Sequence, residues 1–220
     1  MINRFSNLFY IIFLSLIRNL SGSLGIKLRA YYYKKKLKFC GNNLIVSENV
    51  YIEGCEFIEI GDNVHIDKFV FISTSINLSG IIIDNKIENN IIPRGFVKIK
   101  SNIHICPNVL ISGHGGILID NNVVISAGTK IYSLSNLYKP KNLSNSTYSL
   151  MPYKNSYFEI GNVIILNNTW IGLNCIILPG SKIEKDVFLY SNSIVRNETL
   201  IENSVYGSIY NLTKLKNRFE

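Results

Sequence analysis

The stretch Ile165–Val195 (ILNNTWIGLNCIILPGSKIEKDVFLYSNSIV) decides the fold of this chain. A bulky aliphatic residue occupies every sixth position: Ile165, Ile171, Ile177, Ile183, Leu189 and Val195. Four places after each of the first five comes a smaller residue: Thr169, Cys175, Ser181, Val187 or Ser193. This period is neither that of a helix nor that of a simple alternating strand. It predicts a β-solenoid, in which each hexad forms a short strand and a turn, and three such faces close around a narrow core.

The pattern continues toward the N-terminus with two interruptions. Inward aliphatics begin soon after Gly41, become irregular over 73–96, and resume from Ile99 to Ile131. The step from Ile111 to Ile119 is longer than six, so Ser112–Gly116 (SGHGG) is predicted to bulge from a corner. We expect a solenoid over 39–195.

The second interruption is a polar segment at 133–158, which is predicted to form an extended loop. Structureless loops of this length within a regular fold are more often functional than not. Residues 196–220 are expected to leave the solenoid as a C-terminal tail that finishes as a short helix.

Composition narrows the class of protein. The chain has 220 residues, is 47% hydrophobic and 17% charged, and carries a formal net charge of +8. These values indicate one folded domain with appendages. A basic surface attracts phosphates, anionic lipid or nucleic acid without choosing among them. No nucleic-acid motif is present, so we expect no nucleic-acid partner.

The four cysteines, Cys40, Cys55, Cys106 and Cys175, include no CxxC pair. A zinc ribbon, a thioredoxin-like motif and a disulfide framework are therefore unsupported, and a reducing, cytoplasmic compartment is expected.

Residues 1–38 are predicted to be a basic, partly apolar helical segment. Leu8–Ile17 is too short to span a bilayer as a helix, and no signal-peptide cleavage pattern follows it. With the basic run Arg29–Lys38, it is compatible with peripheral contact with the inner membrane face. The alternative is a helix that caps the open end of the solenoid.

Several segments resemble the hexapeptide-repeat acyltransferases. Asn167–Gly180 (NNTWIGLNCIILPG) is the most specific match, and HGGILIDNNVVISAGTKIYS at 114–133 and Ser191–Val195 (SNSIV) add to it. The resemblance covers roughly 40–212 and is greatest to bacterial sugar and polysaccharide O-acetyltransferases. It implies an all-β left-handed parallel β-helix that works as a homotrimer, with acetyl-CoA as co-substrate in the groove between subunits.

The resemblance also implies a mechanism and a site. A histidine acts as general base on the acceptor, which attacks the thioester directly while backbone N–H groups stabilise the oxyanion. Many relatives have this histidine just after the strand that here ends at Tyr132, but Asn136 occupies its position. We expect this segment to bind the acceptor through Tyr132, Asn136 and Tyr138.

His114 is the best replacement for the missing base. It lies in the predicted bulge among Gly113, Gly115 and Gly116, and glycine lets backbone approach a ligand closely. It also precedes Tyr132 by about one coil of the solenoid, so its loop is expected to lie at the same edge.

His65 and His104 are expected to point outward as surface residues, with His104 the second choice of base. The histidine spacings of 39 and 10 residues do not resemble the three-ligand pattern of the carbonic anhydrases that share this fold, so no metal is expected.

For the cofactor, the resemblance implies that the backbone at Gly172–Cys175 and Ser191–Ser193 lines the pantetheine arm. Trp170 is expected to lie along the arm, and Arg196 and Lys214 to contact phosphate. In full, the residues expected to bind the cofactor are Trp170, Gly172, Cys175, Ser191, Ser193, Arg196 and Lys214.

The functional expectation is acetyl-CoA-dependent O-acetylation of a sugar hydroxyl in cell-surface polysaccharide biosynthesis. Two alternatives remain open. One is N-acetylation of a nucleotide-linked amino sugar, and the other is a degenerate solenoid that serves as a binding or assembly module.

Overall fold

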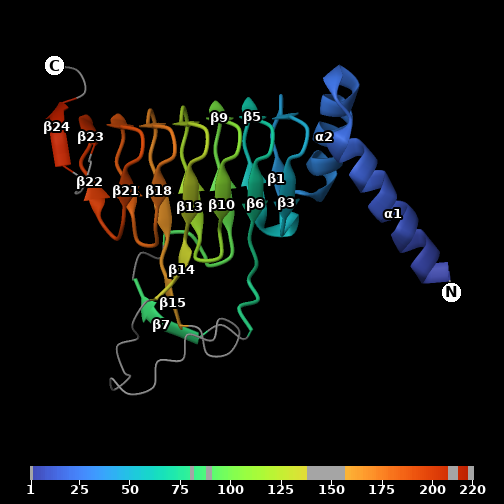
Figure 1. Ribbon diagram of the computed structural model, residues 1–220, viewed down its shortest axis with the longest axis horizontal. Helices are drawn as coiled ribbons and strands as arrows, with labels where there is room; N and C mark the ends of the chain where they lie inside the picture. Colours follow the sequence, from blue (N-terminus) through green and yellow to red (C-terminus); the bar gives the residue numbers. More distant parts are fainter. Residues whose placement is uncertain (1, 80–81, 88–90, 138–156, 208–212, 218–220) are drawn as a thin grey trace.

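The computed structural model is a left-handed parallel β-helix with helices at its N-terminal end, as the sequence predicts (Figure 1). It describes residues 2–79, 82–87, 91–137, 157–207 and 213–217. Three parallel sheets form the faces of the prism, and the chain visits them in the order A, B, C in each coil.

Sheet A holds the first strand of each coil. Its members in spatial order are β1 (Phe39–Cys40), β4 (Ile58–Ile60), β8 (Val97–Ile99), β11 (Ile117–Ile119), β16 (Val163–Ile165), β19 (Lys182–Ile183) and β22 (Thr199–Leu200). A short 3₁₀ turn, η1 (Cys55–Phe57), precedes β4.

Sheets B and C hold the second and third strands. Sheet B contains β2 (Ile45–Val46), β5 (Val64–Ile66), β9 (Ile103–Ile105), β12 (Val124–Ile125), β17 (Trp170–Ile171), β20 (Val187–Leu189) and β23 (Ser204–Gly207). Sheet C contains β3 (Tyr51–Glu53), β6 (Phe71–Ser73), β10 (Leu110–Ser112), β13 (Lys130–Tyr132), β18 (Ile176–Ile177) and β21 (Ile194–Val195).

The core follows the hexad pattern. Every aliphatic hexad position from Ile165 to Val195 is fully buried, and the small residues four places later are at most 2% exposed. Because equivalent positions in successive coils lie in register, these side chains form continuous apolar stacks along the axis. The repeat thus builds one long core without a helix inside it.

Asparagines make the corner between sheets A and B. Asn43, Asn63, Asn102, Asn122 and Asn168 all have φ between 54° and 60°, a left-handed conformation that Asn tolerates. Their side-chain amides hydrogen-bond from coil to coil at 2.9–3.1 Å, and the ladder ends on Asp186. The corner is therefore held by a side-chain ladder parallel to the sheets.

The N-terminal segment forms α1 (Ile2–Asn19) and α2 (Gly22–Lys36). Tyr33 of α2 and Leu37 after it belong to the hydrophobic core, so α2 covers the open end of the solenoid. Arg29 is buried and donates to the carbonyls of Ile17 and Leu20 at 2.8 and 2.6 Å, which fixes α1 to α2. Burial lowers the pKa of the Arg29 guanidinium.

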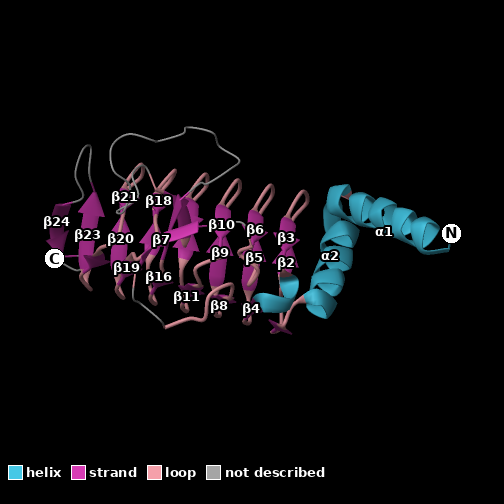
Figure 2. Cartoon of the chain, turned by 90° about the horizontal axis from the view of Figure 1, so that it is seen from below, coloured by secondary structure: helices cyan, strands magenta, loops and turns pink. Residues whose placement is uncertain are grey.

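The capping role expected as one alternative for residues 1–38 is thus filled by α2, whereas α1 projects away from the solenoid (Figures 1 and 2). Large apolar side chains of α1 are exposed, among them Ile11, Phe13 and Leu16. Within the described residues, no helix has the length and apolar character needed to cross a bilayer.

The C-terminal boundary of the solenoid was predicted wrongly. Strands β22 and β23 pair in parallel with β19 and β20, so the solenoid continues beyond residue 195. After it, β24 (Thr213–Asn217) pairs antiparallel with β23 where a short helix was expected. The step from Val195 to the buried Leu200 is one residue shorter than a hexad, which hides the last coil from a strict period of six.

The two interruptions leave the solenoid at the same corner, between sheets C and A, and pair with each other. Strand β7 (Ile82–Lys86) comes from the first, and β14 (Leu134–Asn136) and β15 (Tyr157–Ile160) come from the second. They form a separate three-stranded sheet, sheet D, in the order β14, β15, β7 beside the solenoid (Figure 1). Segment 133–158 is thus partly strand where a loop was expected.

Candidate active site

The glycine loop Ser112–Gly116 turns the chain from β10 into β11, directly beside both insertions. Its backbone is fixed on both sides: the Gly113 N–H donates to the carbonyl of Ser73 at 2.8 Å, and the Gly95 N–H donates to the carbonyl of His114 at 3.1 Å. Gly116 has φ +95°, a conformation in which a residue with a side chain would be strained. The predicted bulge therefore exists and is rigid.

Two buried polar side chains hold this loop. Asn162 donates to the carbonyls of Gly115 and Ile92 at 2.7 and 2.9 Å, and its Oδ1 accepts from the Ile92 N–H at 3.0 Å. The Ser133 hydroxyl accepts from the Gly115 N–H at 2.8 Å and donates to the carbonyl of Ser112 at 2.9 Å. The loop is thus tied to the first insertion and to the start of the second.

The imidazole of His114 is half-buried, and its Nδ1 lies 3.1 Å from the Ser112 hydroxyl. Burial lowers the pKa of His114, and the nearby Glu53 carboxylate raises it by a smaller amount. The net direction favours the neutral imidazole near pH 7. The tautomer that donates from Nδ1 to Ser112 leaves Nε2 unprotonated, the form that a general base requires.

A row of polar residues runs past His114, and the sequence pointed only to its last member, Tyr132. Glu53, Ser73, Ser112 and Tyr132 end four successive strands of sheet C and lie in register. Each is one coil away from the next in space, so the signal was present in the hexad alignment, but the insertion between Ser73 and Ser112 hides it. The row leads from His114 along the edge from which the insertions emerge.

Of the three residues expected to bind the acceptor, one lies in this row. Tyr132 ends β13 and is half-buried next to Ser112. Asn136 is exposed on β14, outside the solenoid, where it pairs with Phe158. Tyr138 lies outside the described residues.

The residues expected to bind the cofactor gather elsewhere. Trp170 on β17 is 46% exposed and donates from its indole N–H to the Ser126 hydroxyl at 3.1 Å. At the corner between sheets B and C, the exposed Ser191 hydroxyl accepts from the Leu173 N–H at 3.0 Å, beside Gly172. A Cβ on Gly172 would lie 2.5 Å from the Ser191 nitrogen, so the backbones are closely apposed there.

The other four residues have different surroundings. The side chains of Cys175 and Ser193 are buried and hydrogen-bond the Tyr190 carbonyl at 3.2 and 2.7 Å, so only their backbone is available to a ligand. Arg196 pairs with Glu159 of β15 at 3.2 Å, which directs its guanidinium toward sheet D. Lys214 lies in β24, and its side chain is outside the described part of the chain.

The structure therefore divides the expected site between two corners of the prism. His114 and Tyr132 lie at the corner that follows sheet C, whereas Gly172 and Ser191 lie at the corner that follows sheet B. One chain does not bring the two sets together.

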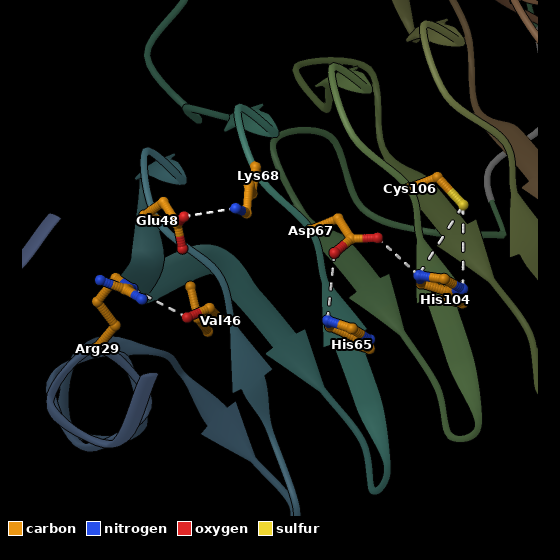
Figure 3. A network of polar contacts seen from close by, with 8 residues as sticks. All are labelled: Arg29, Val46, Glu48, His65, Asp67, Lys68, His104 and Cys106. Atoms are coloured by element: carbon orange, nitrogen blue, oxygen red, sulfur yellow. Dashed lines mark hydrogen bonds and ion pairs between the residues drawn. The ribbon is translucent and has the colours of Figure 1, made fainter. Parts of the chain in front are cut away.

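A second histidine cluster lies on the outward face of sheet B (Figure 3). His65 and His104 are stacked, with ring centroids 4.9 Å apart, and both contact Asp67. Their side chains are 40% and 44% exposed, as expected for outward-pointing residues. The sequence analysis did not foresee that they meet.

Among known proteins, the chain is similar to acyltransferases. No protein-family model matches the chain. A dTDP-4-amino-4,6-dideoxy-D-glucose acyltransferase from Escherichia coli is 27% identical over 161 residues, which is 73% of each chain.

Solved structures agree. A variant of AntD, an N-acyltransferase from Bacillus cereus, in complex with dTDP-4-amino-4,6-dideoxyglucose and coenzyme A, is 25% identical with a TM-score of 0.65, over 87% of this chain and 90% of that one. The hexapeptide-repeat acetyltransferase VCA0836 from Vibrio cholerae with acetyl coenzyme A matches at 17% identity and a TM-score of 0.52, over 94% and 84%, which shows the fold alone.

These relatives favour the alternative expectation, acyl transfer to a nucleotide-linked amino sugar, over O-acetylation of a polysaccharide. They also confirm the resemblance found in the sequence, since the core pattern, the fold and the related proteins agree. In its sequence pattern and its fold, the chain resembles the hexapeptide-repeat, left-handed β-helix acyltransferases.

Proposed function

We propose that this protein transfers an acyl group from an acyl-CoA to the amine of a nucleotide-linked amino sugar. The observation that carries the proposal is the half-buried His114, fixed at the corner where both insertions leave the solenoid, in a chain that aligns along most of its length with AntD. AntD has been solved with dTDP and 3-hydroxybutyryl-CoA as well as with the amino sugar nucleotide, and these ligands define the donors and acceptors to test on this chain.

In the proposed reaction the sugar amine attacks the thioester carbonyl. A C–N bond forms and the C–S bond breaks, and CoA leaves as the thiol. His114 accepts the proton that the attacking nitrogen releases and returns it to the departing sulfur, so no covalent enzyme intermediate forms. Ser112 fixes the ring by its contact with Nδ1.

The glycine loop positions this base, but its three glycine N–H groups do not supply the oxyanion donors. The N–H groups of Gly113, Gly115 and Gly116 all donate within the protein, to Ser73, Ser133 and Gly113. We infer that the thioester oxygen receives its hydrogen bonds from other backbone N–H groups.

The separation of the two corners supports a homotrimer. A cyclic trimer brings two different surfaces of neighbouring subunits together, and we propose that these are the sheet B to C corner of one subunit and the sheet C to A corner of the next. Gly172 and Ser191 of one subunit would then bind CoA opposite His114 of another, and activity would require assembly. Arg196 and Lys214 remain predicted phosphate contacts.

The experiment is a coupled measurement of CoA release and product mass with purified protein. Acetyl-CoA and 3-hydroxybutyryl-CoA serve as donors, with dTDP-4-amino-4,6-dideoxyglucose, its 4-hydroxy counterpart and an oligosaccharide as acceptors. Amine-dependent release with an amide product supports the proposal. Release only with hydroxyl acceptors would support O-acetylation instead. Absence of both turnover and CoA binding would favour the assembly module.

The location of the protein follows from its chemistry. Nucleotide sugars and acyl-CoA are cytoplasmic metabolites, which supports a cytoplasmic enzyme. The exposed apolar side chains of α1 and the run Lys34–Lys36 are the basis for a peripheral contact with the inner membrane. The relatives give no support for that contact, and sedimentation with anionic vesicles, with and without residues 1–19, tests it.

A further inference from the structure

We propose that His65, Asp67 and His104, completed by Cys106, form a binding site for a divalent transition metal ion of the zinc type. The site lies on the outward face of sheet B and the adjoining corner, away from the glycine loop, and it is independent of the proposed acyl transfer (Figure 3).

The parallel pairing of two coils creates the cluster. His65 of β5 and His104 of β9 are register partners, and their rings lie nearly parallel, with an interplanar angle of 9°. Asp67, just after β5, presents Oδ1 to the His65 Nε2 at 3.3 Å and Oδ2 to the His104 Nε2 at 2.8 Å. One ligand atom from each residue lies within 4.8 Å of the others.

The donor set suits zinc. Two imidazole nitrogens and a carboxylate oxygen are a common zinc ligand set, whereas calcium and magnesium prefer oxygen alone. The Cys106 sulfur lies 4.0 Å from both ring nitrogens of His104 and offers a fourth, soft ligand.

Metal binding needs only small movements. Zinc takes nitrogen and oxygen ligands at about 2.0–2.2 Å and sulfur at about 2.3 Å, so both rings must tilt toward Asp67. The two imidazoles are partly exposed and belong to no core stack, and χ rotation therefore suffices. The nearest ammonium group on the same turn, Lys68, is paired with Glu48 at 2.6 Å and points away from Asp67 (Figure 3).

A bound ion would join two coils that the sequence separates. The insertion between β6 and β8 carries the chain out of the solenoid between the coil of His65 and the coil of His104. This detour produces the long histidine spacing that argued against a metal site in the sequence. A metal cross-link would hold the two coils in register across this detour.

The test is titration of the tag-free, full-length protein with Zn²⁺ and Co²⁺, followed by calorimetry and visible absorption. We expect one ion per chain and at least a tenfold weaker affinity in H65A, H104A and D67N. The C106S variant should lose the thiolate-to-cobalt charge-transfer band. The matched control is H114A, which removes the histidine outside the cluster and should bind as the wild type does.

A second readout is thermal unfolding. An ion that binds only the folded state shifts the unfolding equilibrium about 100-fold when its free concentration is about 100 times its Kd. The wild type and H114A should therefore melt at a higher temperature with Zn²⁺, and the cluster variants should not. Absence of binding, or equal affinity in wild type and in folded H104A and C106S, would overturn the proposal.

Discussion

This protein has two histidine sites, one at His114 and one at the pair His65 and His104. Both lie on the same solenoid, but their surroundings differ. His114 lies on a glycine loop among buried polar side chains and contacts one hydroxyl. His65 and His104 lie on a regular sheet face, partly exposed, and share one carboxylate. The regular repeat places His65 and His104 where they can share a ligand, whereas the loop that interrupts the repeat holds His114 alone.

This difference separates two kinds of chemistry. A half-buried imidazole with a lowered pKa is neutral near pH 7 and is suited to accept a proton. A stacked pair that shares one carboxylate brings two ring nitrogens and a carboxylate oxygen within 4.8 Å of one another, which is suited to hold a cation. The following predictions separate these roles, beginning with the largest effect.

Replacement of His114 by Ala is expected to lower kcat/KM for acyl transfer by about 10²–10⁴-fold, because it removes the proposed general base. The loop is held by its backbone and by Asn162, so the fold should persist. Steady-state kinetics with circular dichroism as the folding check measures this.

The comparison variant is His104→Ala, which we expect to change kcat/KM by less than about threefold. A large loss in His104→Ala together with a small one in His114→Ala would reverse the assignment of the base.

Replacement of Asn162 by Ala should destabilise the corner itself. The buried amide makes three hydrogen bonds, to Gly115 and twice to Ile92, and their loss leaves buried backbone groups without partners. We expect a loss of about 2–4 kcal/mol in the free energy of unfolding, since each unsatisfied buried group costs about 1–3 kcal/mol. Denaturant unfolding measures it.

The exposed Asn42→Ala serves as the control and should change stability by less than about 0.5 kcal/mol. Equal stability of the two variants would mean that the glycine loop is not held by Asn162. Metal binding at His65 and His104 should survive in Asn162→Ala, because that cluster shares no contact with Asn162.

Replacement of Ser112 by Ala is expected to lower kcat by about 3–10-fold, with KM for acyl-CoA unchanged. The hydroxyl contacts Nδ1 of His114 at 3.1 Å, and one such hydrogen bond contributes about 0.5–1.5 kcal/mol. Ser73→Ala removes the neighbouring hydroxyl of the same row and should have a smaller effect. Equal losses in both variants would make Ser112 part of a general polar edge and not the positioning partner of His114.

The fold could be predicted because its determinant is local and repeated. The hexads specify the strand, the turn and the inward position at once, and the asparagines supply the left-handed corners. The last coil was not predicted because the step before Leu200 is shorter than six residues. The bulge at Ser112–Gly116 was found because two additional residues break a strict period.

The contacts of the site could not be predicted in the same way. The pairing of β7 with β15 and the ion pair of Arg196 with Glu159 involve the strands of the insertions, and the meeting of His65 with His104 joins two coils across the first insertion. The spacing of such residues in the sequence depends on insertion length and not on the coil. Only the three-dimensional register shows that Glu53, Ser73, Ser112 and Tyr132 form one row.

The smallest expected effect is in the pH dependence of kcat/KM, which should report on His114. Burial lowers the pKa of His114 below the ordinary histidine value of about 6.5. The acid limb of kcat/KM in the free enzyme should therefore have its midpoint below about pH 6.5. Pre-steady-state or steady-state rates between pH 5 and 8 would show this, and a midpoint above that value would contradict the neutral base.

The free energy of unfolding should also depend on the titration of His114, in the direction that proton linkage gives. Between the folded pKa of His114 and about 6.5, the unfolded chain binds more protons than the folded one, so unfolding becomes easier as pH falls. The contribution is complete above about pH 6.5 and is lost as pH falls through that window. His114→Gln should flatten this part of the wild-type stability profile.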